Sequence, residues 1–127
     1  MKKDMKSILI AEDNEMLRET YKEIFIAANY GVDTAVNGSE AFHLIRNKDY
    51  DLVFTDFSMP YLTGVELLNQ CQDMKKPIPA FILNTGHSNL AGLGDTSKFS
   101  AVLRKCEEVD MILQTIADVI KRTELSA

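Results

Sequence analysis

Leu52-Val53-Phe54-Thr55-Asp56-Phe57-Ser58-Met59-Pro60 is the segment that decides the fold of this chain. Its first four residues are apolar or β-branched, which is typical of a strand that is buried on both faces. The carboxylate of Asp56 ends this run, and Pro60 and Gly64 then mark a loop. In an open parallel sheet, ligands and reactive groups collect at the carboxyl ends of the strands. Asp56 is therefore a candidate functional residue, although a lone aspartate at such a place often only starts a turn.

Four other short apolar runs predict strands at residues 7–11, 32–36, 80–85 and 101–104. Between the strands, apolar residues recur at the spacing of amphipathic helices. We expect Gly31 to end the first helix in a left-handed turn, and Asn37-Gly38-Ser39 to provide a turn and a cap for the second. The helical apolar positions are Leu17, Tyr21, Ile24, Phe25 and Ala28; Ala41, Leu44 and Ile45; Val65, Leu68 and Cys71; and Val109, Ile112, Leu113, Ile116, Val119 and Ile120.

Strand and helix alternate five times along the chain, and this order determines the fold class. Strands that are apolar on both faces need helices on both sides of the sheet. The sequence therefore predicts an α/β domain, with a doubly wound parallel sheet between two helix layers. The weakest part of the pattern is residues 86–100, where three glycines would each cost a helix about 1 kcal/mol relative to alanine. We expect only a short or mobile helix in this segment.

Length and composition narrow the classes of function. The 127 residues fit one domain, and 46% hydrophobic with 26% charged residues is usual for a globular protein. A net charge of −5 argues against non-specific binding to nucleic acid or to an anionic membrane. The apolar runs are too short to span a bilayer, and no secretion signal follows the basic start. Cys71 and Cys106 lack metal-ligand spacing, so we expect reduced thiols in a cytoplasmic protein.

The carboxyl ends of four predicted strands bring together Glu12, Asp13, Asp56, Thr85 and Lys105. Three carboxylates in one crevice repel one another, so the site needs a cation, and their oxygens suit Mg²⁺ or Mn²⁺. The hydroxyl of Thr85 and the ammonium of Lys105 are donors suited to phosphoryl oxygens. In this setting Asp56 is a candidate nucleophile that forms an acyl phosphate, with the metal and Lys105 offsetting charge in the transition state.

These residues resemble the motifs of response-regulator receiver domains, the family of the chemotaxis protein CheY. The resemblance covers essentially the whole chain, and we expect residues 1–127 to form a single receiver domain. It rests on Ile8-Leu9-Ile10-Ala11-Glu12-Asp13-Asn14, on the D-x-x-M-P-x-x-x-G run from Asp56 to Gly64, and on Thr85 and Lys105 after two later strands. The resemblance implies a flavodoxin-like (βα)5 three-layer sandwich with strand order 2-1-3-4-5. It also implies a two-component signalling domain that catalyses only its own phosphoryl transfer and dephosphorylation.

The resemblance further implies a role for each polar residue. Asp56 would accept a phosphoryl group from a phosphohistidine on a sensor histidine kinase or a phosphotransfer protein. Thr85 would be the switch hydroxyl, and Lys105 would be the phosphate-binding ammonium. The fourth helix and the fifth strand would respond by changing the contacts made with an output protein. The magnesium ligands would be Asp13, Asp56, the backbone carbonyl of Ser58 and, through water, Glu12.

Three departures from the family pattern fall on the output side. Cys106 follows Lys105 where the family usually has proline, so the backbone of a Lys-Pro peptide is in doubt. Val102 occupies a position that is often aromatic, so the usual coupling of such a ring to Thr85 is absent in its common form. The segment 86–100 is rich in glycine and shortened. Phosphorylation is therefore a firmer expectation than any route of signal output.

Other functions stay open at this point. The departures favour a pseudo-receiver, which would act as an interaction module without phosphorylation. An aspartyl-nucleophile phosphatase would need D-x-D-x-T after the first strand, whereas this chain has Glu12-Asp13-Asn14-Glu15. A flavodoxin would need a phosphate-binding loop rich in serine, threonine and glycine after Ile10, and none follows.

Simpler structural interpretations also apply to single residues. Asp13 and Asn14 could only cap the first helix, and Thr85 could be an ordinary strand residue. Lys105 could be a solvated lysine. His87 is either a plain loop residue or, with Ser58, a side chain that sets the rate of dephosphorylation.

Overall fold

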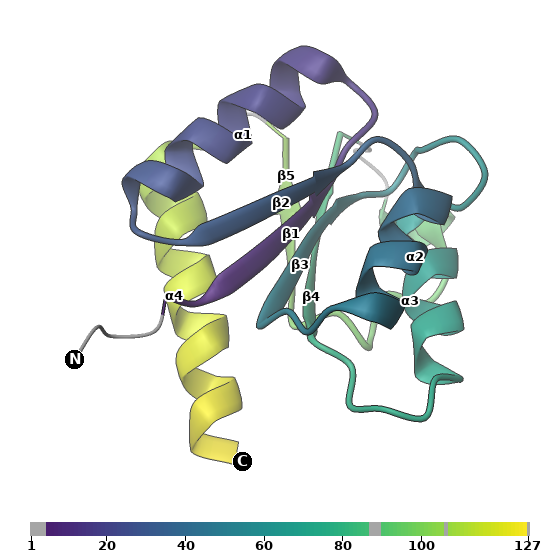
Figure 1. Cartoon of the computed structure of the whole chain (residues 1–127). Helices are drawn as coiled ribbons and strands as arrows, with labels where there is room; N and C mark the ends of the chain where they lie inside the picture. Colours follow the sequence, from purple (N-terminus) through teal and green to yellow (C-terminus); the bar gives the residue numbers. More distant parts are fainter. Residues whose placement is uncertain (1–4, 87–89, 106, 127) are drawn as a thin grey trace.

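The computed structural model describes residues 5–86, 90–105 and 107–126, and its centre is a five-stranded parallel sheet. Its strands are β1 (Ser7–Ala11), β2 (Gly31–Ala35), β3 (Leu52–Asp56), β4 (Ala80–Thr85) and β5 (Ala101–Arg104). The order is β2-β1-β3-β4-β5, and every neighbouring pair is parallel (Figure 1). The α-helices are α1 (Glu15–Ala27), α2 (Gly38–Asn47), α3 (Gly64–Gln72) and α4 (Val109–Ser126). The predicted doubly wound sheet and its strand order are confirmed.

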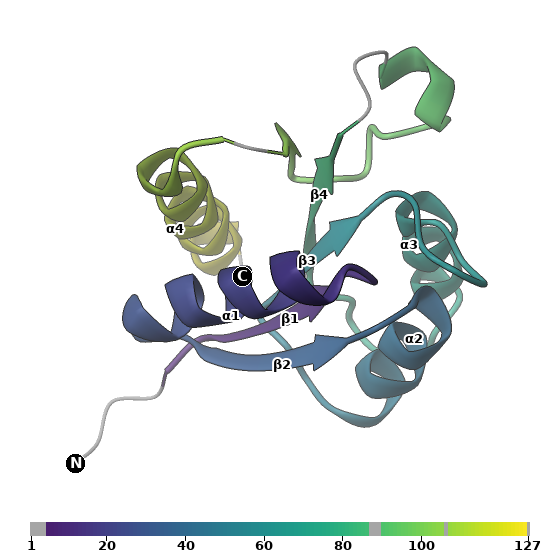
Figure 2. The ribbon, with the colours of Figure 1, turned by 90° about the horizontal axis from the view of Figure 1, so that it is seen from above.

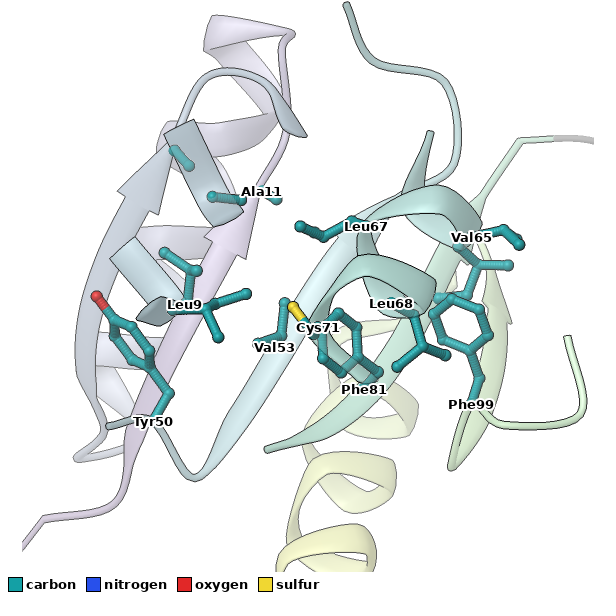
Figure 3. Close-up of a cluster of buried hydrophobic side chains, with 14 of the residues drawn as sticks. Leu9, Ala11, Tyr50, Val53, Val65, Leu67, Leu68, Cys71, Phe81 and Phe99 are labelled. Carbon is teal, nitrogen blue, oxygen red and sulfur yellow. The ribbon is translucent and has the colours of Figure 1, made fainter. Parts of the chain in front are cut away.

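The helices cover both faces of the sheet. Helices α1 and α4 lie on one face, and α2 and α3 lie on the other (Figures 1 and 2). Successive strand residues point to opposite faces, so Leu9 joins the core under α2 and α3, which Figure 3 shows, whereas Ile8 and Ile10 join the core under α1 and α4. Within the described residues, no helix has the length and apolar character required to cross a membrane.

Polar caps explain where three helices begin. The side chain of Asn14 accepts a hydrogen bond from Leu17 N (2.9 Å), and Asn37 caps α2 as predicted. Thr63 and Glu66 form a reciprocal capping box at the start of α3. The end of α1 corrects one prediction. Asn29, with φ of 73°, supplies the left-handed residue, and Gly31 instead begins β2.

The connection between β4 and β5 contains no α-helix among its described residues. It forms only a 3₁₀ helix, η1 (Leu90–Leu93), which agrees with the prediction of a short helix. The helix expected between the last two strands is therefore present only as this 3₁₀ segment. Gly92 lies inside η1 and Gly94 has φ of 91°, so glycine both weakens a helix here and permits a backbone that leaves one.

Candidate functional site

Three carboxylates gather at the carboxyl ends of the central strand, β3, and its neighbour β1. Glu12 and Asp13 directly follow β1, and Asp56 is the last residue of β3. One carboxylate oxygen from each residue lies within 4.8 Å of the other two, and we call this group the acidic cluster. Glu12 and Asp56 are buried, with 2% and 6% of their surface exposed, whereas Asp13 is exposed. The sequence-predicted convergence of these residues is therefore present in the structure.

The backbone of the acidic cluster is held by its neighbours in the fold. Glu12 N donates to the carbonyl of Ala35, and Asn14 N donates to the Glu12 carboxylate at 3.2 Å. The guanidinium of Arg18 donates to the carbonyls of Glu12 (3.0 Å) and Asp13 (3.5 Å). Asn14 supplies the helix cap, so the carboxylate of Asp13 is left to the acidic cluster.

Lys105 provides the positive charge of the site. Its Nζ lies 3.1 Å from Glu12 Oε1 and 3.2 Å from Asp56 Oδ2. Its backbone N–H donates to the carbonyl of Thr85 at 2.9 Å, which extends the pairing of β5 with β4 by one residue. This bond fixes the start of the lysine side chain beside the acidic cluster. The neighbouring Arg104 is exposed, so the structure places Lys105 and not Arg104 in the site.

Burial and mutual repulsion determine the electrostatics of the site. Burial raises the pKa of Glu12, and the charge of Asp56 raises it further. Burial also raises the pKa of Asp56, although Lys105 acts in the opposite direction. Burial alone would lower the pKa of Lys105, but the two carboxylates outweigh it and the pKa is raised. Lys105 is thus held as an ammonium, while the charged form of both buried carboxylates is disfavoured.

The loop after β3 is closely packed around Asp56. Gly64 N donates to the carbonyl of Phe57 at 2.9 Å, which closes the loop. A Cβ at Gly64 would lie only 2.5 Å from the Asp56 carbonyl oxygen, so glycine is required there. Ser58, the predicted carbonyl ligand, is exposed two residues after Asp56. Tyr61 has φ of 75°, a strained backbone for a bulky residue.

The same loop rests on the beginning of α2. A Cβ at Gly38 would lie 2.5 Å from Leu62 Cβ and 2.7 Å from the Leu62 carbonyl oxygen. Ordinary non-bonded carbon atoms are rarely closer than about 3.5 Å. Any side chain at Gly38 would therefore push the loop that follows Asp56 away from the helix.

The predicted residues of β4 and β5 have different surroundings. Thr85 is the last residue of β4 and is completely buried. Val102 lies in β5, partly buried against the core under α3. His87 and Cys106 lie outside the described residues, so their predicted roles stay predictions.

Sequence reasoning missed one buried polar pair next to the site. Asn84 is the register partner of Asp56, and its Nδ2 donates to the Tyr21 hydroxyl at 2.9 Å. Its Oδ1 is buried without a hydrogen-bond partner among the described residues. The sequence signal for this pair was the side-chain amide of Asn84, a polar group inside the apolar run of residues 80–85. Arg18 was also missed, although its place one turn after Asn14 put it within reach of the acidic cluster.

The arrangement suits a divalent cation. Three carboxylates and one ammonium leave two formal negative charges, which one divalent ion would neutralise. Hard oxygen donors of this kind favour Mg²⁺. The donor set therefore fits the ion that was predicted from the sequence.

Comparison with known proteins places this geometry in a family context. A family model described as the response regulator receiver domain matches residues 8–117. The transcriptional regulatory protein FixJ of Bradyrhizobium diazoefficiens is 28% identical over 123 residues, which cover 94% of this chain and 59% of FixJ. The chain spans between 6% and 59% of the length of several such curated relatives.

Solved structures resemble the whole domain. A CheY-like response regulator receiver domain protein from Methanospirillum hungatei has a TM-score of 0.89 at 24% identity, covering 98% of this chain and 100% of that one. The response regulator TrrA of Thermotoga maritima, solved in complex with Mg²⁺-BeF, has a TM-score of 0.83 at 30% identity. That alignment covers 91% of this chain and 99% of TrrA.

Proposed function

The chain belongs to the family of response regulator receiver domains, and we propose that it is a Mg²⁺-dependent phosphoacceptor of a two-component system. In this proposal residues 1–127 act as one receiver domain, and Asp56 takes a phosphoryl group from a phosphohistidine. The donor would be a sensor histidine kinase or a phosphotransfer protein, and the output would be a changed contact with another protein. The carrying observation is that the buried Asp56 carboxylate lies beside both a second buried carboxylate and the ammonium of Lys105.

Each residue of the site has a distinct part in the proposed transfer. An oxygen of Asp56 attacks phosphorus, the N–P bond of the phosphohistidine breaks, and its electron pair leaves on the imidazole nitrogen. Lys105, 3.2 Å from Asp56 Oδ2, exchanges part of that ion pair for a phosphoryl oxygen. Thr85 donates its hydroxyl to another phosphoryl oxygen and thereby reports phosphorylation.

The metal ligands in this proposal are the acidic cluster and the loop after β3. Asp13, Asp56 and the carbonyl of Ser58 would hold Mg²⁺, and Glu12 would act through bound water. When bound, the ion supplies charge neutralisation for the phosphoryl oxygens. The raised pKa values of Glu12 and Asp56 support this assignment, because burial disfavours both charged carboxylates and a bound cation would stabilise them.

Intact-protein mass spectrometry with acetyl phosphate and Mg²⁺ tests the proposal. We expect an adduct of about 80 Da that is stable in acid and labile in base, as an acyl phosphate is. Asp56→Asn should abolish the adduct. Asp51→Asn is the matched control, because Asp51 is an exposed aspartate at the other end of the same strand segment, where it binds Ser7. An adduct that survives in Asp56→Asn would refute the assignment.

The experiment also separates the alternatives. No adduct, together with no change in the NMR spectrum on adding beryllofluoride, would favour the pseudo-receiver interaction module. The observation that favours this second candidate is that η1 is the only helix among the described residues between β4 and β5. Continuous turnover of a phosphate ester would instead identify a phosphatase.

A further inference from the structure

A groove far from Asp56 lies between the carboxyl-terminal ends of α2 and α3. Its volume is about 470 Å³. Lys76, on its wall, donates to the Lys48 carbonyl and to Asp49 in the turn that enters β3, whereas Asp56 ends β3. The groove therefore lies toward the opposite end of the sheet from the acidic cluster. Its lining residues are Phe42, Arg46, Gln70, Asp73, Met74, Lys75 and Lys76.

The groove has an apolar floor. Phe42 and Met74 are partly buried and pack against the core under α2 and α3. The guanidinium of Arg46 lies 5.6 Å from the centre of the Phe42 ring, within range of a cation–π contact. Met74 adds an unbranched, polarizable side chain that adapts to the shape of a partner. Both residues keep exposed apolar surface that an incoming side chain would cover.

The rim of the groove is positively charged, in contrast to the molecule as a whole. Three cationic side chains face one carboxylate among the lining residues, in a chain whose net charge is −5. Lys76 is offset by Asp49, at 3.1 Å. Arg46 and Lys75 are exposed and pair with no carboxylate among the described residues. Their charges are therefore open to a ligand.

We propose that this groove binds an acidic segment of a partner protein. An apolar side chain of that segment covers Phe42 and Met74, while its carboxylates pair with Arg46 and Lys75. An apolar centre with a charged rim is the usual anatomy of a protein interface, and guanidinium binds carboxylate in a two-pronged geometry. Only two unpaired cations and the nearby Asp73 make a poor track for a nucleic acid backbone. The residues that line the groove include none of the acidic cluster, so the two sites share no side chain.

A labelled synthetic peptide that alternates glutamate and leucine is the probe. Its binding to the full chain is followed by fluorescence anisotropy and by backbone amide NMR shifts. We expect shifts concentrated at residues 42–46 and 70–76. The double variant Arg46→Glu/Lys75→Glu should weaken binding at least about tenfold, which corresponds to about 1.4 kcal/mol. Replacing leucine by serine in the peptide should weaken binding similarly.

Matched controls separate this site from general charge and from Asp56. Lys22→Glu/Lys121→Glu makes the same change in net charge on the α1 and α4 side and should leave binding unchanged. Asp56→Asn should also bind normally, so failure of the phosphoacceptor proposal leaves this one intact. Equal weakening of peptide binding by both double variants, or NMR shifts that lie elsewhere on the domain, would refute the groove as the binding site. Binding of phosphatidylglycerol vesicles in place of the peptide, or self-association through the groove, would overturn the proposed occupant.

Discussion

Lys105 and Lys48 each pair with an aspartate, but the surroundings of the two ion pairs are opposite. At the site, Lys105 lies 3.2 Å from Asp56, with side chains 20% and 6% exposed. At the edge of the sheet, Lys48 lies 2.7 Å from Asp33 on β2, with side chains 56% and 37% exposed. The shorter contact is therefore the more solvated one. Distance alone does not indicate which pair matters energetically, because burial sets the cost of an unpaired charge.

The two aspartates show this difference in their pKa values. Hydrogen bonding from Lys48 lowers the pKa of Asp33, with a further contribution from the hydroxyl of Tyr50 at 2.7 Å. Burial instead raises the pKa of Asp56, in spite of Lys105. The fold thus favours the charged form of Asp33 and disfavours that of Asp56. The edge pair is a structural contact, whereas burial at the site disfavours the charged form of its carboxylates.

Removing each lysine gives the largest expected contrast. Lys105→Met leaves two buried carboxylates without their ammonium, so we expect a loss of about 3 kcal/mol in the free energy of unfolding at neutral pH without Mg²⁺. Lys48→Met should cost only about 0.5 kcal/mol, because solvent screens that pair. Urea denaturation of both variants measures the difference. Equal losses would mean that burial does not distinguish the two pairs.

The second largest contrast is expected for the loss of stability when a glycine near each ion pair is replaced by alanine. Gly64→Ala places a Cβ 2.5 Å from the Asp56 carbonyl oxygen and 3.1 Å from Leu83 Cδ1, so we expect a loss of about 2 kcal/mol from overpacking. Gly31→Ala, at the start of the strand that carries Asp33, meets nothing closer than 3.9 Å. It should change stability by about 0.5 kcal/mol or less. Thermal unfolding followed by circular dichroism provides the measurement.

Neutralising each aspartate should change stability in opposite directions. Asp56→Asn removes one of two buried carboxylates and leaves Lys105 paired with Glu12, so we expect a gain of about 1 kcal/mol without Mg²⁺. Asp33→Asn should lose a few tenths of a kcal/mol. Adding Mg²⁺ should stabilise the parent chain but not Asp56→Asn. A destabilised Asp56→Asn would contradict the inferred cost of burying two charged carboxylates side by side.

The smallest expected effect is the pH dependence of the same pair of variants. The lowered pKa of Asp33 gives stability that is complete above its unfolded value of 3.8 and is lost as pH falls through the folded pKa. Asp56 has the opposite sign, because its raised pKa makes stability rise as pH falls from the folded value toward 3.8. Asp33→Asn should therefore flatten the acid loss, and Asp56→Asn should steepen it. Urea denaturation without metal, at a series of pH values below and above 3.8, measures how the free energy of unfolding of each variant depends on pH.

The sequence predicted the sheet well because its strands are short, apolar and separated by strong turn signals. Residues 7–11, 80–85 and 101–104 are strands as predicted, and the acidic cluster follows from where such strands end. The left-handed residue at Asn29 was assigned to Gly31, because a local pattern does not tell which of two permissive residues takes positive φ.

Other features depend on contacts between distant parts of the chain. The pairing of Asn84 with Tyr21 spans 63 positions, and the groove between α2 and α3 exists only once both helices are packed. The exposure that separates Lys48 from Lys105 is likewise a tertiary property. The sequence pattern predicts where the strands end and which residues lie there. How much each ion pair contributes to stability depends on its burial, which only the three-dimensional packing determines.

Helix α2 connects the loop that follows Asp56 to the groove, because Leu62 of that loop packs against Gly38 at the start of the helix. Its first residue carries the loop that follows Asp56, and Phe42 and Arg46 further along it line the groove. The packing at Gly38 leaves no free space, since even a methyl group there would collide with Leu62. The loop that follows Asp56 therefore cannot move closer to α2 unless the first turn of the helix moves as well.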